Sequence, residues 1–193
     1  MARNTREGTE ATRLALISAA RGLFVEKGYG ETATPDIVAA AGVTRGALYH
    51  HFEDKKALFR AVIEQEAAAV SIEIDRTFAL DETPRDALLS GTSAYFAAMA
   101  EPGRARLMVL EAPVVLGVEA ATAIDRDNAE SRLQQGVADC LGAKASDDQV
   151  VALAHLLSAA FDRTVLEIER GGDRALYEAA IALLIDGLIP PQP

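Results

Sequence analysis

Tryptophan is absent from this sequence, cysteine occurs once, and no hydrophobic run is long enough to cross a bilayer. The single cysteine, Cys140, cannot close a disulfide within the chain. The polar start ARNTREGTEAT lacks the apolar core of a secretory signal peptide. Charged residues or proline interrupt the longest apolar stretches, for example at Glu111, Pro113 and Asp186. These absences predict a cytoplasmic protein without a membrane segment.

Alternating runs of Val, Ile and Thr, the usual pattern of strands, are also missing. Half of the residues are hydrophobic, alanine is the dominant type, and aromatic residues make up only 5% of the chain. This composition favours helices over sheets. A chain of 193 residues is long enough to bury a core and to divide into two parts. We therefore expect an all-α protein with a small domain and a larger one.

The net charge of −10 is unevenly distributed along the chain. Residues 1–60 contain nine Lys or Arg against seven Asp or Glu, whereas residues 61–193 contain ten against twenty-two. Only the first region can approach a polyanion without strong repulsion. An acidic total therefore does not exclude a nucleic-acid partner.

Start and stop residues divide the chain into roughly nine helices. Gly28 is expected to end the first helix, Thr34 to cap the second ahead of Pro35, and Ser146 with Gln149 to form a capping box. The fourth helix, capped by Asp54, is expected to bury one seam, made up of Leu58, Val62, Gln65, Ala69 and Ile72. The predicted helices cover residues 9–27, 34–41 and 45–52, a long helix after Asp54, residues 83–100, 104–111, 117–141 and 147–170, and a last helix capped by Asp173.

The stretch VTRGALYHHFEDK contains a short helix with two different sides. Leu48 and Phe52, four residues apart, fall on one side and are expected to pack on the two preceding helices. A two-turn helix, a turn at Gly42 and a second two-turn helix form a helix-turn-helix. The opposite side of the second helix carries Arg45, Gly46, Tyr49 and His50.

The residue types on this side suit the groove of a DNA duplex. Arg45 can reach a phosphate or pair with guanine, Tyr49 can donate its hydroxyl to a phosphate, and His50 can contact a phosphate or a base edge. Gly46 weakens the helix, but its missing side chain allows the backbone to come close to the duplex. Lys55 begins the fourth helix, where its charge and free backbone N–H groups favour an anion.

The segment FVEKGYGETATPDIVAAAGVTRGALYHHFEDKKALF resembles the DNA-binding domain of tetracycline-repressor-like (TetR/AcrR) transcriptional regulators. The matching features are F-x-x-x-G-Y from Phe24, the A-G-V-T-x-G-x-L-Y-x-H-F pattern from Ala41 to Phe52, and F-x-D-K-x-x-L ending at Leu58. The resemblance implies a repressor that binds a near-palindromic operator as a homodimer. It also implies that residues 9–55 form the helix-turn-helix domain and that residues 56–193 bind a small molecule and dimerise.

The DNA contacts that the resemblance implies can be carried over position by position. Ala33 stands where a hydroxyl is frequent in the family, and Pro35 stands where some members have a basic residue that contacts DNA. These departures leave Thr34 as the contact expected from the second helix. The other contacts expected are Thr44, Arg45, Gly46, Tyr49, His50 and Lys55.

The C-terminal part contains candidates for a subunit interface. Residues 179–185 are seven consecutive apolar residues, so the last helix must be covered on more than one side. It is either a central core helix or part of a two-fold dimer, and its terminal position favours the dimer. The expected interface residues are Leu157, Phe161, Ile181, Leu184 and Leu188.

Candidates for a ligand pocket are less distinct. Tyr95, Met99 and Met108 also suit a plain core, and His155 and Asp162 also suit a satisfied polar seam along the penultimate helix. The Glu and Asp residues between positions 119 and 139 are expected to form a solvated face. The candidate ligand contacts are Tyr95, Met99, Met108, His155 and Asp162.

Other classes of function have weaker support. Adjacent helical residues such as His50 and His51 point about 100° apart and cannot chelate one ion, so we expect no metal and no cofactor. The sequence has no phosphate loop, nucleophile elbow or HExxH motif, which argues against an enzyme. The remaining alternative is a helical adaptor that kept the fold and lost DNA binding. The polar side of the helix after Thr44 weighs against it.

Overall fold

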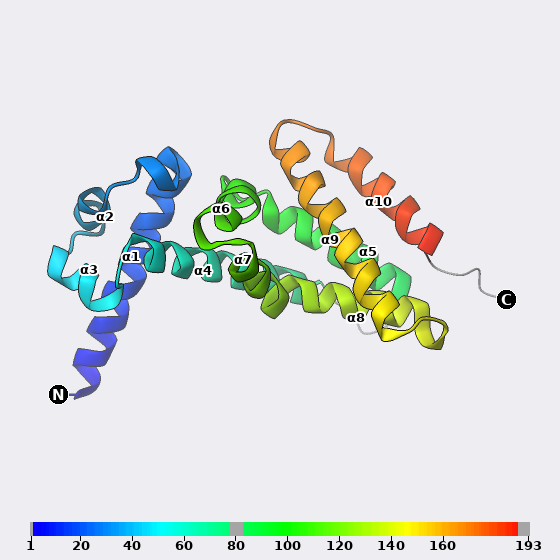
Figure 1. Cartoon of the computed structure of the whole chain (residues 1–193), viewed down its shortest axis with the longest axis horizontal. Coiled ribbons are helices and arrows are strands. Elements are labelled where there is room, and N and C mark those ends of the chain that lie inside the picture. The colour runs from blue at the N-terminus through cyan, green and yellow to red at the C-terminus, as the bar shows by residue number, and fades with distance from the viewer. Residues whose placement is uncertain (1, 78–82, 189–193) are drawn as a thin grey trace. The chain divides into compact units, whose positions relative to one another are not determined.

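The structure, a computed structural model, describes residues 2–77 and 83–188 and consists of helices joined by short connections (Figure 1). Within those two ranges there is no strand, which confirms the all-α prediction. None of the helices described there is long and apolar enough to span a membrane. The α-helices are α1 (Ala2–Glu31), α2 (Thr34–Ala41), α3 (Arg45–His51), α4 (Lys55–Asp75), α5 (Pro84–Met99), α6 (Ala112–Leu116), α7 (Val118–Asp125), α8 (Ser131–Leu141), α9 (Asp147–Glu169) and α10 (Arg174–Leu188).

Three short segments with other helical geometries complete the chain. The π-helix η1 (Arg106–Glu111) precedes α6, and the π-helix η2 (Arg126–Glu130) joins α7 to α8. The 3-10 helix η3 (Gly142–Lys144) follows α8. The single helix predicted over residues 117–141 is therefore three consecutive helical segments.

Several predicted helix ends are confirmed. The side chain of Ser146 accepts a hydrogen bond from the N–H of Gln149, and the Gln149 side chain accepts one from the N–H of Ser146. Asp54 Oδ1 accepts a hydrogen bond from Ala57 N–H at 2.6 Å, just before α4. These local patterns determine helix ends without help from distant parts of the chain.

Two local predictions were wrong. Ala33, and not Thr34, is the N-cap of α2, and no side chain caps this helix; Thr34 is its first residue. In α4, Gln65 is exposed and Ile72 is half-exposed, although both were expected in the buried seam. The prediction assumed one continuous buried stripe along α4, but α4 belongs to one compact unit up to Glu66 and to another from Ala67 onward.

The chain folds into two compact units. Unit 1 contains the residues up to Glu66 together with Arg106–Ala121, and unit 2 contains Ala67–Ala105 together with the residues from Thr122 onward. The segment with η1 and α6 therefore belongs to unit 1, although it lies beyond residue 55 in the sequence. The functional division into residues 9–55 and 56–193 stays a prediction, and it does not coincide with these units.

In unit 1, α2 and α3 pack on α1 (Figure 1). The buried side chains of Leu16, Phe24, Ile37 and Leu48 form their shared core. Burial of large apolar side chains of this kind contributes roughly 1.5–3 kcal/mol each. The position of α3 is therefore determined by α1 and by its own buried side.

Helix α1 is interrupted at Gly28, where φ is 80° and ψ is 163°. Side chains other than glycine rarely adopt this φ, so the residue allows the break. The break separates Tyr29 N–H from the carbonyl of Val25, to which it would donate in a continuous helix. Tyr29 N–H donates instead to Glu111 Oε2 at 2.9 Å.

The carbonyls just before the break in α1 also accept hydrogen bonds from a residue of η1. Arg106 Nη2 donates to the carbonyl oxygens of Phe24 and Val25, at 2.6 and 2.7 Å. Arg106 also forms an ion pair with Glu111 at 3.3 Å. We call the contacts of Arg106 and Glu111 with the end of α1 the α1 clamp.

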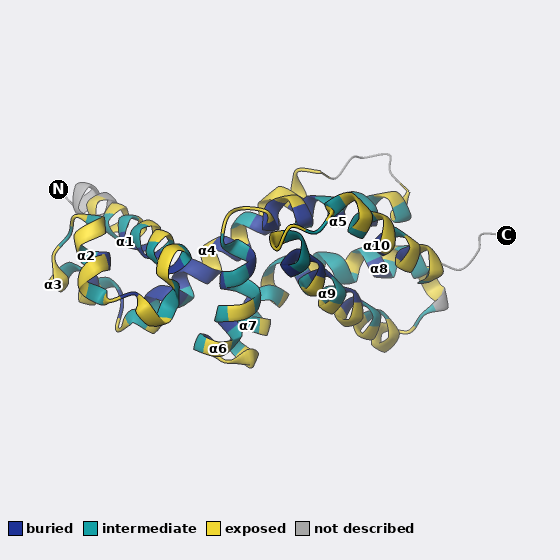
Figure 2. Cartoon of the chain, turned by 90° about the horizontal axis from the view of Figure 1, so that it is seen from above, coloured by how far each residue is buried: buried dark blue, intermediate teal, exposed yellow. Residues whose placement is uncertain are grey.

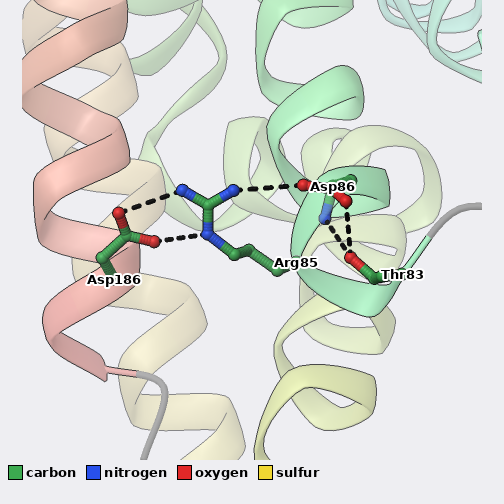
Figure 3. A network of polar contacts seen from close by, with 4 residues as sticks. All are labelled: Thr83, Arg85, Asp86 and Asp186. Atoms are coloured by element: carbon green, nitrogen blue, oxygen red, sulfur yellow. Dashed lines mark hydrogen bonds and ion pairs between the residues drawn. The ribbon is translucent and has the colours of Figure 1, made fainter. Parts of the chain in front are cut away.

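In unit 2, α5, α8 and α9 pack on one another, and α10 packs on α5. Figure 3 shows the polar contacts at the start of α5, where Arg85 Nε and Nη2 donate to the two oxygens of Asp186 on α10, at 2.6 and 3.0 Å. Thr83 caps α5 by accepting a hydrogen bond from Asp86 N–H at 3.2 Å, which confirms the predicted start of this helix. The end of α10 is thus tied to the beginning of α5.

Candidate nucleic-acid interface and ligand cavity

Helix α3 has a buried side and an exposed side, as the sequence predicts. Leu48 is fully buried and Phe52, at the C-cap, is 6% exposed. The exposed residues are those expected to contact DNA: Thr44, Arg45, Gly46, Tyr49 and His50. Packing within the chain therefore accounts for Leu48 and Phe52 but not for the polar set.

The turn before α3 is built from two local features. Gly42 has a φ of 66°, in the left-handed region that favours glycine, and caps the end of α2. Thr44 is the N-cap of α3, and its Oγ1 accepts a hydrogen bond from Ala47 N–H at 3.1 Å. The hydroxyl of Thr44 remains able to donate its own proton to an outside acceptor.

The exposed side chains of α3 contact one another along the helix. The guanidinium carbon of Arg45 lies 5.5 Å from the ring centroid of Tyr49, within the range of a cation–π contact. The rings of His50 and His51 meet edge to face, with centroids 5.3 Å apart. The exposed side chains of α3 thus include one cation, Arg45, and two hydrogen-bond donors, the Tyr49 hydroxyl and the His50 imidazole, and no carboxylate.

Gly46 has no packing role inside the chain. A Cβ built on it would meet only Thr44 Oγ1 within 4 Å, at 3.8 Å. Alanine would fit there and is the better helix former. Within residues 2–77 and 83–188, packing therefore does not require glycine at this position.

Lys55 has a role that the sequence did not reveal. Its Nζ donates to the carbonyl oxygens of Tyr29 and Thr32, at 2.8 and 2.9 Å, and lies 4.2 Å from the Tyr29 ring centroid. Burial raises the pKa of the Tyr29 hydroxyl, and the charge of Asp54 raises it further. Lys55 thus ties the start of α4 to the segment after the break in α1, and its predicted contact with a phosphate stays a prediction.

Unit 2 contains a partly open cavity of about 270 Å³ between α5, α8 and α9. The end of α4, the last residue of α7 and the segment η2 complete its wall. Its apolar wall includes Ile74, Leu88, Leu133 and Phe161. A concave, largely apolar space with a few polar groups is the usual form of a small-molecule site.

Carboxylates supply most of the charge in the wall. Glu130 is 4% exposed, and its Oε1 lies 2.8 Å from Nε2 of His155. Tyr95 donates its hydroxyl to Asp162 Oδ1 at 3.3 Å. Burial and, to a smaller extent, the charges of Asp162 and Glu130 together raise the pKa of the Asp125 carboxyl to about 6.

The structure brings together only some of the predicted ligand contacts. Tyr95 lines the cavity and Asp162 contacts it through a hydrogen bond, whereas exposed His155 reaches the wall only through Glu130. Met99 is buried outside the wall, and Met108 belongs to unit 1. The ligand contacts stay a prediction.

Sequence reasoning missed Asp125 and Glu130. Both lie in the acidic stretch that was expected to be a solvated face, but Glu130 is buried, and Asp125, which is partly exposed, lines the cavity. The π-helix η2 includes Glu130, and its five-residue hydrogen-bond spacing shifts side chains away from the α-helical pattern used in the prediction. An acidic residue in an otherwise polar stretch gives no other sign of burial.

Both parts of the chain match models of one protein family. Residues 16–62 match the model for bacterial regulatory proteins of the tetR family. Residues 85–190, more than half of the chain, match the model for the C-terminal domain of tetracycline-repressor-like proteins. The chain belongs to the TetR family. The first match overlaps residues 9–55, the second lies within residues 56–193, and the functional division itself stays a prediction.

Curated relatives are similar to the N-terminal part. The HTH-type transcriptional regulator AcrR of Shigella flexneri is 44% identical over 64 residues, which are 33% of this chain and 30% of that protein. The HTH-type transcriptional repressor BepR of Brucella suis biovar 1 is 43% identical over 61 residues, which are 32% of this chain and 29% of that protein. The matches thus span about a third of the length of these TetR-family relatives.

Solved structures extend the similarity over nearly the whole chain. A TetR-family transcriptional regulator from Pectobacterium atrosepticum is 28% identical with a TM-score of 0.71, and the match covers 97% of this chain and 99% of that one. A TetR-family regulator from Syntrophomonas wolfei has a TM-score of 0.76 at 15% identity, covering 93% and 95%. The second similarity shows the shared fold alone.

The predicted dimer contacts differ in their exposure to solvent. Leu157, Phe161 and Ile181 are buried in unit 2, so this single chain already covers them. Leu184 is 54% exposed. Figure 2 shows further exposed positions along α9 and α10, and the large apolar residues among them are Val151, Leu156, Leu176 and Leu183. The dimer contacts stay a prediction, for which these exposed residues are the accessible candidates.

The raised pKa of Asp125 makes a prediction about stability. An ionised carboxylate in this wall destabilises the folded state; the penalty is absent below about pH 4 and complete above about pH 6. We expect Asp125→Asn to stabilise the protein by up to about 3 kcal/mol at pH 7.5. In calorimetric melting, the increase in Tm should shrink as the pH falls from 6 to 4. Asp127→Asn, an exposed neighbour outside the wall, serves as the control and should change Tm little. An equal Tm for Asp125→Asn and the unchanged chain at pH 7.5 would contradict the prediction.

Proposed function

We propose that this chain is a ligand-responsive DNA-binding transcriptional regulator, a repressor that binds a palindromic operator as a homodimer and is released by a small molecule. The observation that carries the proposal is the exposed side of α3. It presents Arg45, Tyr49 and His50 to solvent while Leu48 fixes the helix from behind. Membership of the TetR family supports the same function.

In this proposal α3 enters the major groove. Arg45 contacts a phosphate or a guanine edge, and the Tyr49 hydroxyl and His50 add phosphate contacts. Thr44 and Thr34, at the starts of α3 and α2, bring hydroxyl and backbone N–H groups to the same duplex. Gly46 allows the close approach of the backbone.

A second copy of the chain supplies the second half-site. The exposed leucines of α9 and α10 form the surface through which two copies pair, because exposed apolar residues on neighbouring helices gain most from burial. A two-fold dimer presents two α3 helices to successive major grooves, about 34–36 Å apart on an inverted repeat.

The cavity in unit 2 is the site of the small molecule in this proposal. Asp125, in the cavity wall, is the last residue of α7, whose first residues belong to unit 1. A ligand that moves this end of α7 therefore acts on a helix shared by both units. Release of DNA requires that the ligand bind better to the conformation with the incompatible spacing, since equal affinity for both states shifts nothing.

Gly46→Ala tests the DNA contact without damaging the fold. We expect its stability to be unchanged or higher by up to about 1 kcal/mol, because alanine favours a helix. Its affinity for a duplex from the DNA flanking its own gene should fall by about tenfold, a loss of about 1.4 kcal/mol, because the new methyl group holds α3 away from the groove. Fluorescence anisotropy measures the affinity and thermal melting the stability.

The matched control is Gly22→Ala, which adds the same methyl group to an exposed position of α1 with no atom within 4 Å. It should keep full affinity. Equal affinity of Gly46→Ala and the unchanged chain would remove close contact by α3 from the proposal. Failure of the unchanged chain to bind the duplex even at low salt would favour the adaptor instead.

Leu184→Glu tests the dimer. Because Leu184 is 54% exposed in the single chain, the change should leave the chain folded and soluble but place two carboxylates in the subunit interface. Sedimentation velocity should show a monomer, with an unchanged helical circular dichroism spectrum. Val114→Glu, at an 83% exposed residue of α6, makes the same chemical change elsewhere and should remain a dimer. A stable dimer of Leu184→Glu would place the interface on another surface.

A further inference from the structure

The cavity in unit 2 has an unbalanced charge. Its wall contains the carboxylates Asp125, Glu130 and Asp139 and a single guanidinium, that of Arg132. Arg132 donates through Nε and Nη2 to the two oxygens of Asp75, at 2.5 and 2.6 Å. The one cationic side chain of the wall is thus already paired with a carboxylate outside it.

The carboxylates differ in how they are satisfied. Glu130 is paired with His155 and receives a hydrogen bond from Gln134. Asp139 lies at an exposed position and accepts from Gln135 at 2.8 Å. Asp125 has neither a hydrogen-bond donor to its carboxylate nor a cationic partner within residues 2–77 and 83–188. It is therefore the group whose charge is left for a ligand to neutralise.

The rest of the wall suits an organic molecule. The rings of Tyr95 and Phe161 line the cavity with centroids 5.8 Å apart, and the faces of aromatic rings attract cations. Leu88 and Leu133 provide apolar surface, and Gly91 leaves open space, because a Cβ built on it would meet no atom within 4 Å. A volume of about 270 Å³ is slightly below the usual range of about 300–1,000 Å³, so the ligand is small.

We propose that this cavity binds a small organic cation, a molecule with one ammonium group and an aromatic or aliphatic body, with Asp125 as its counter-ion. The inference rests on the proposed function, because it names the chemical class of the small molecule that releases the DNA. An anion would meet three carboxylates and no available cation. A metal ion would lack ligands, since no group of three His, Cys, Asp or Glu residues in the described ranges could hold one.

The charge of Asp125 makes binding depend on pH. The charges of Asp162 from α9 and Glu130 from η2 act on its carboxyl, and its own charge acts on Tyr95 from α5. Arg132 and Asp139 from α8 line the same cavity, and His155 from α9 contacts Glu130. Because burial raises the pKa of Asp125 to about 6, the carboxyl is protonated at pH 5 and ionised at pH 7.5. A cation competes with this proton, so its affinity should fall by about tenfold from pH 7.5 to pH 5.

The test uses two compounds of nearly the same shape. Benzyltrimethylammonium carries a positive charge at every pH, and neopentylbenzene replaces its nitrogen by carbon. We expect isothermal titration of the full chain, without DNA, to show one benzyltrimethylammonium bound per chain at pH 7.5. Neopentylbenzene should bind at least tenfold more weakly, and its affinity should not change with pH.

The substitution Asp125→Asn tests whether Asp125 is the counter-ion of the bound cation. The variant should fold, because it removes an unpaired charge from the cavity wall. It should reduce the affinity for benzyltrimethylammonium at pH 7.5 by at least tenfold and abolish the pH dependence. Asp127→Asn makes the same change outside the wall and should bind like the unchanged chain. Equal affinity of the two compounds, unchanged affinity of Asp125→Asn, or no binding of the cation at millimolar concentration would each overturn the inference. DNA binding is measured separately, so its absence would contradict the proposed function and leave this result intact.

Discussion

The α1 clamp is the interaction on which the arrangement of unit 1 depends. Gly28 breaks α1, and the broken end takes its hydrogen-bond partners from Arg106 and Glu111, about eighty positions further along the chain. Lys55 closes the other side of the break through the carbonyls of Tyr29 and Thr32. Because α2 and α3 pack on α1, a helix end capped by the middle of the chain supports the surface that we propose for DNA. Without these donors and acceptors the broken helix end would leave polar backbone groups unpaired, at a penalty of about 1–3 kcal/mol for each one buried.

The same clamp explains why the two units do not follow the order of the sequence. Residues 106–121 join unit 1, and the chain then returns to unit 2 within α7, which ends at Asp125 in the cavity wall. A single helix thus begins beside the clamped segment and ends at the charge that we assign to the ligand. This connection gives the proposed regulation a physical route through one covalently continuous helix, in place of a chain of loose contacts.

The sequence predicted the features that depend on neighbours along the chain. The two sides of α3, the turn at Gly42, the start of α5 at Thr83 and the caps at Asp54 and Ser146 all follow from local spacing and from side chains that reach only three residues away. The features it did not predict depend on tertiary contacts. Lys55 binds carbonyls more than twenty residues away, Asp125 and Glu130 enter a cavity wall from an acidic stretch, and Leu157, Phe161 and Ile181 are covered by their own chain. Burial of such residues is decided by which helices meet, and the periodicity of one helix does not contain that information.

The most direct test of the central claim, that the exposed side of α3 binds DNA, is hydrogen–deuterium exchange of the full chain with and without a saturating operator duplex. Amides throughout residues 34–55 should exchange more slowly in the complex, with the largest change in peptides that contain Arg45, Gly46 and Tyr49, because the duplex covers them and damps local opening. Peptides from α10 should show little change in exchange, because this helix lies outside the proposed DNA surface. Unchanged exchange throughout residues 34–55 while the duplex is bound would contradict the account.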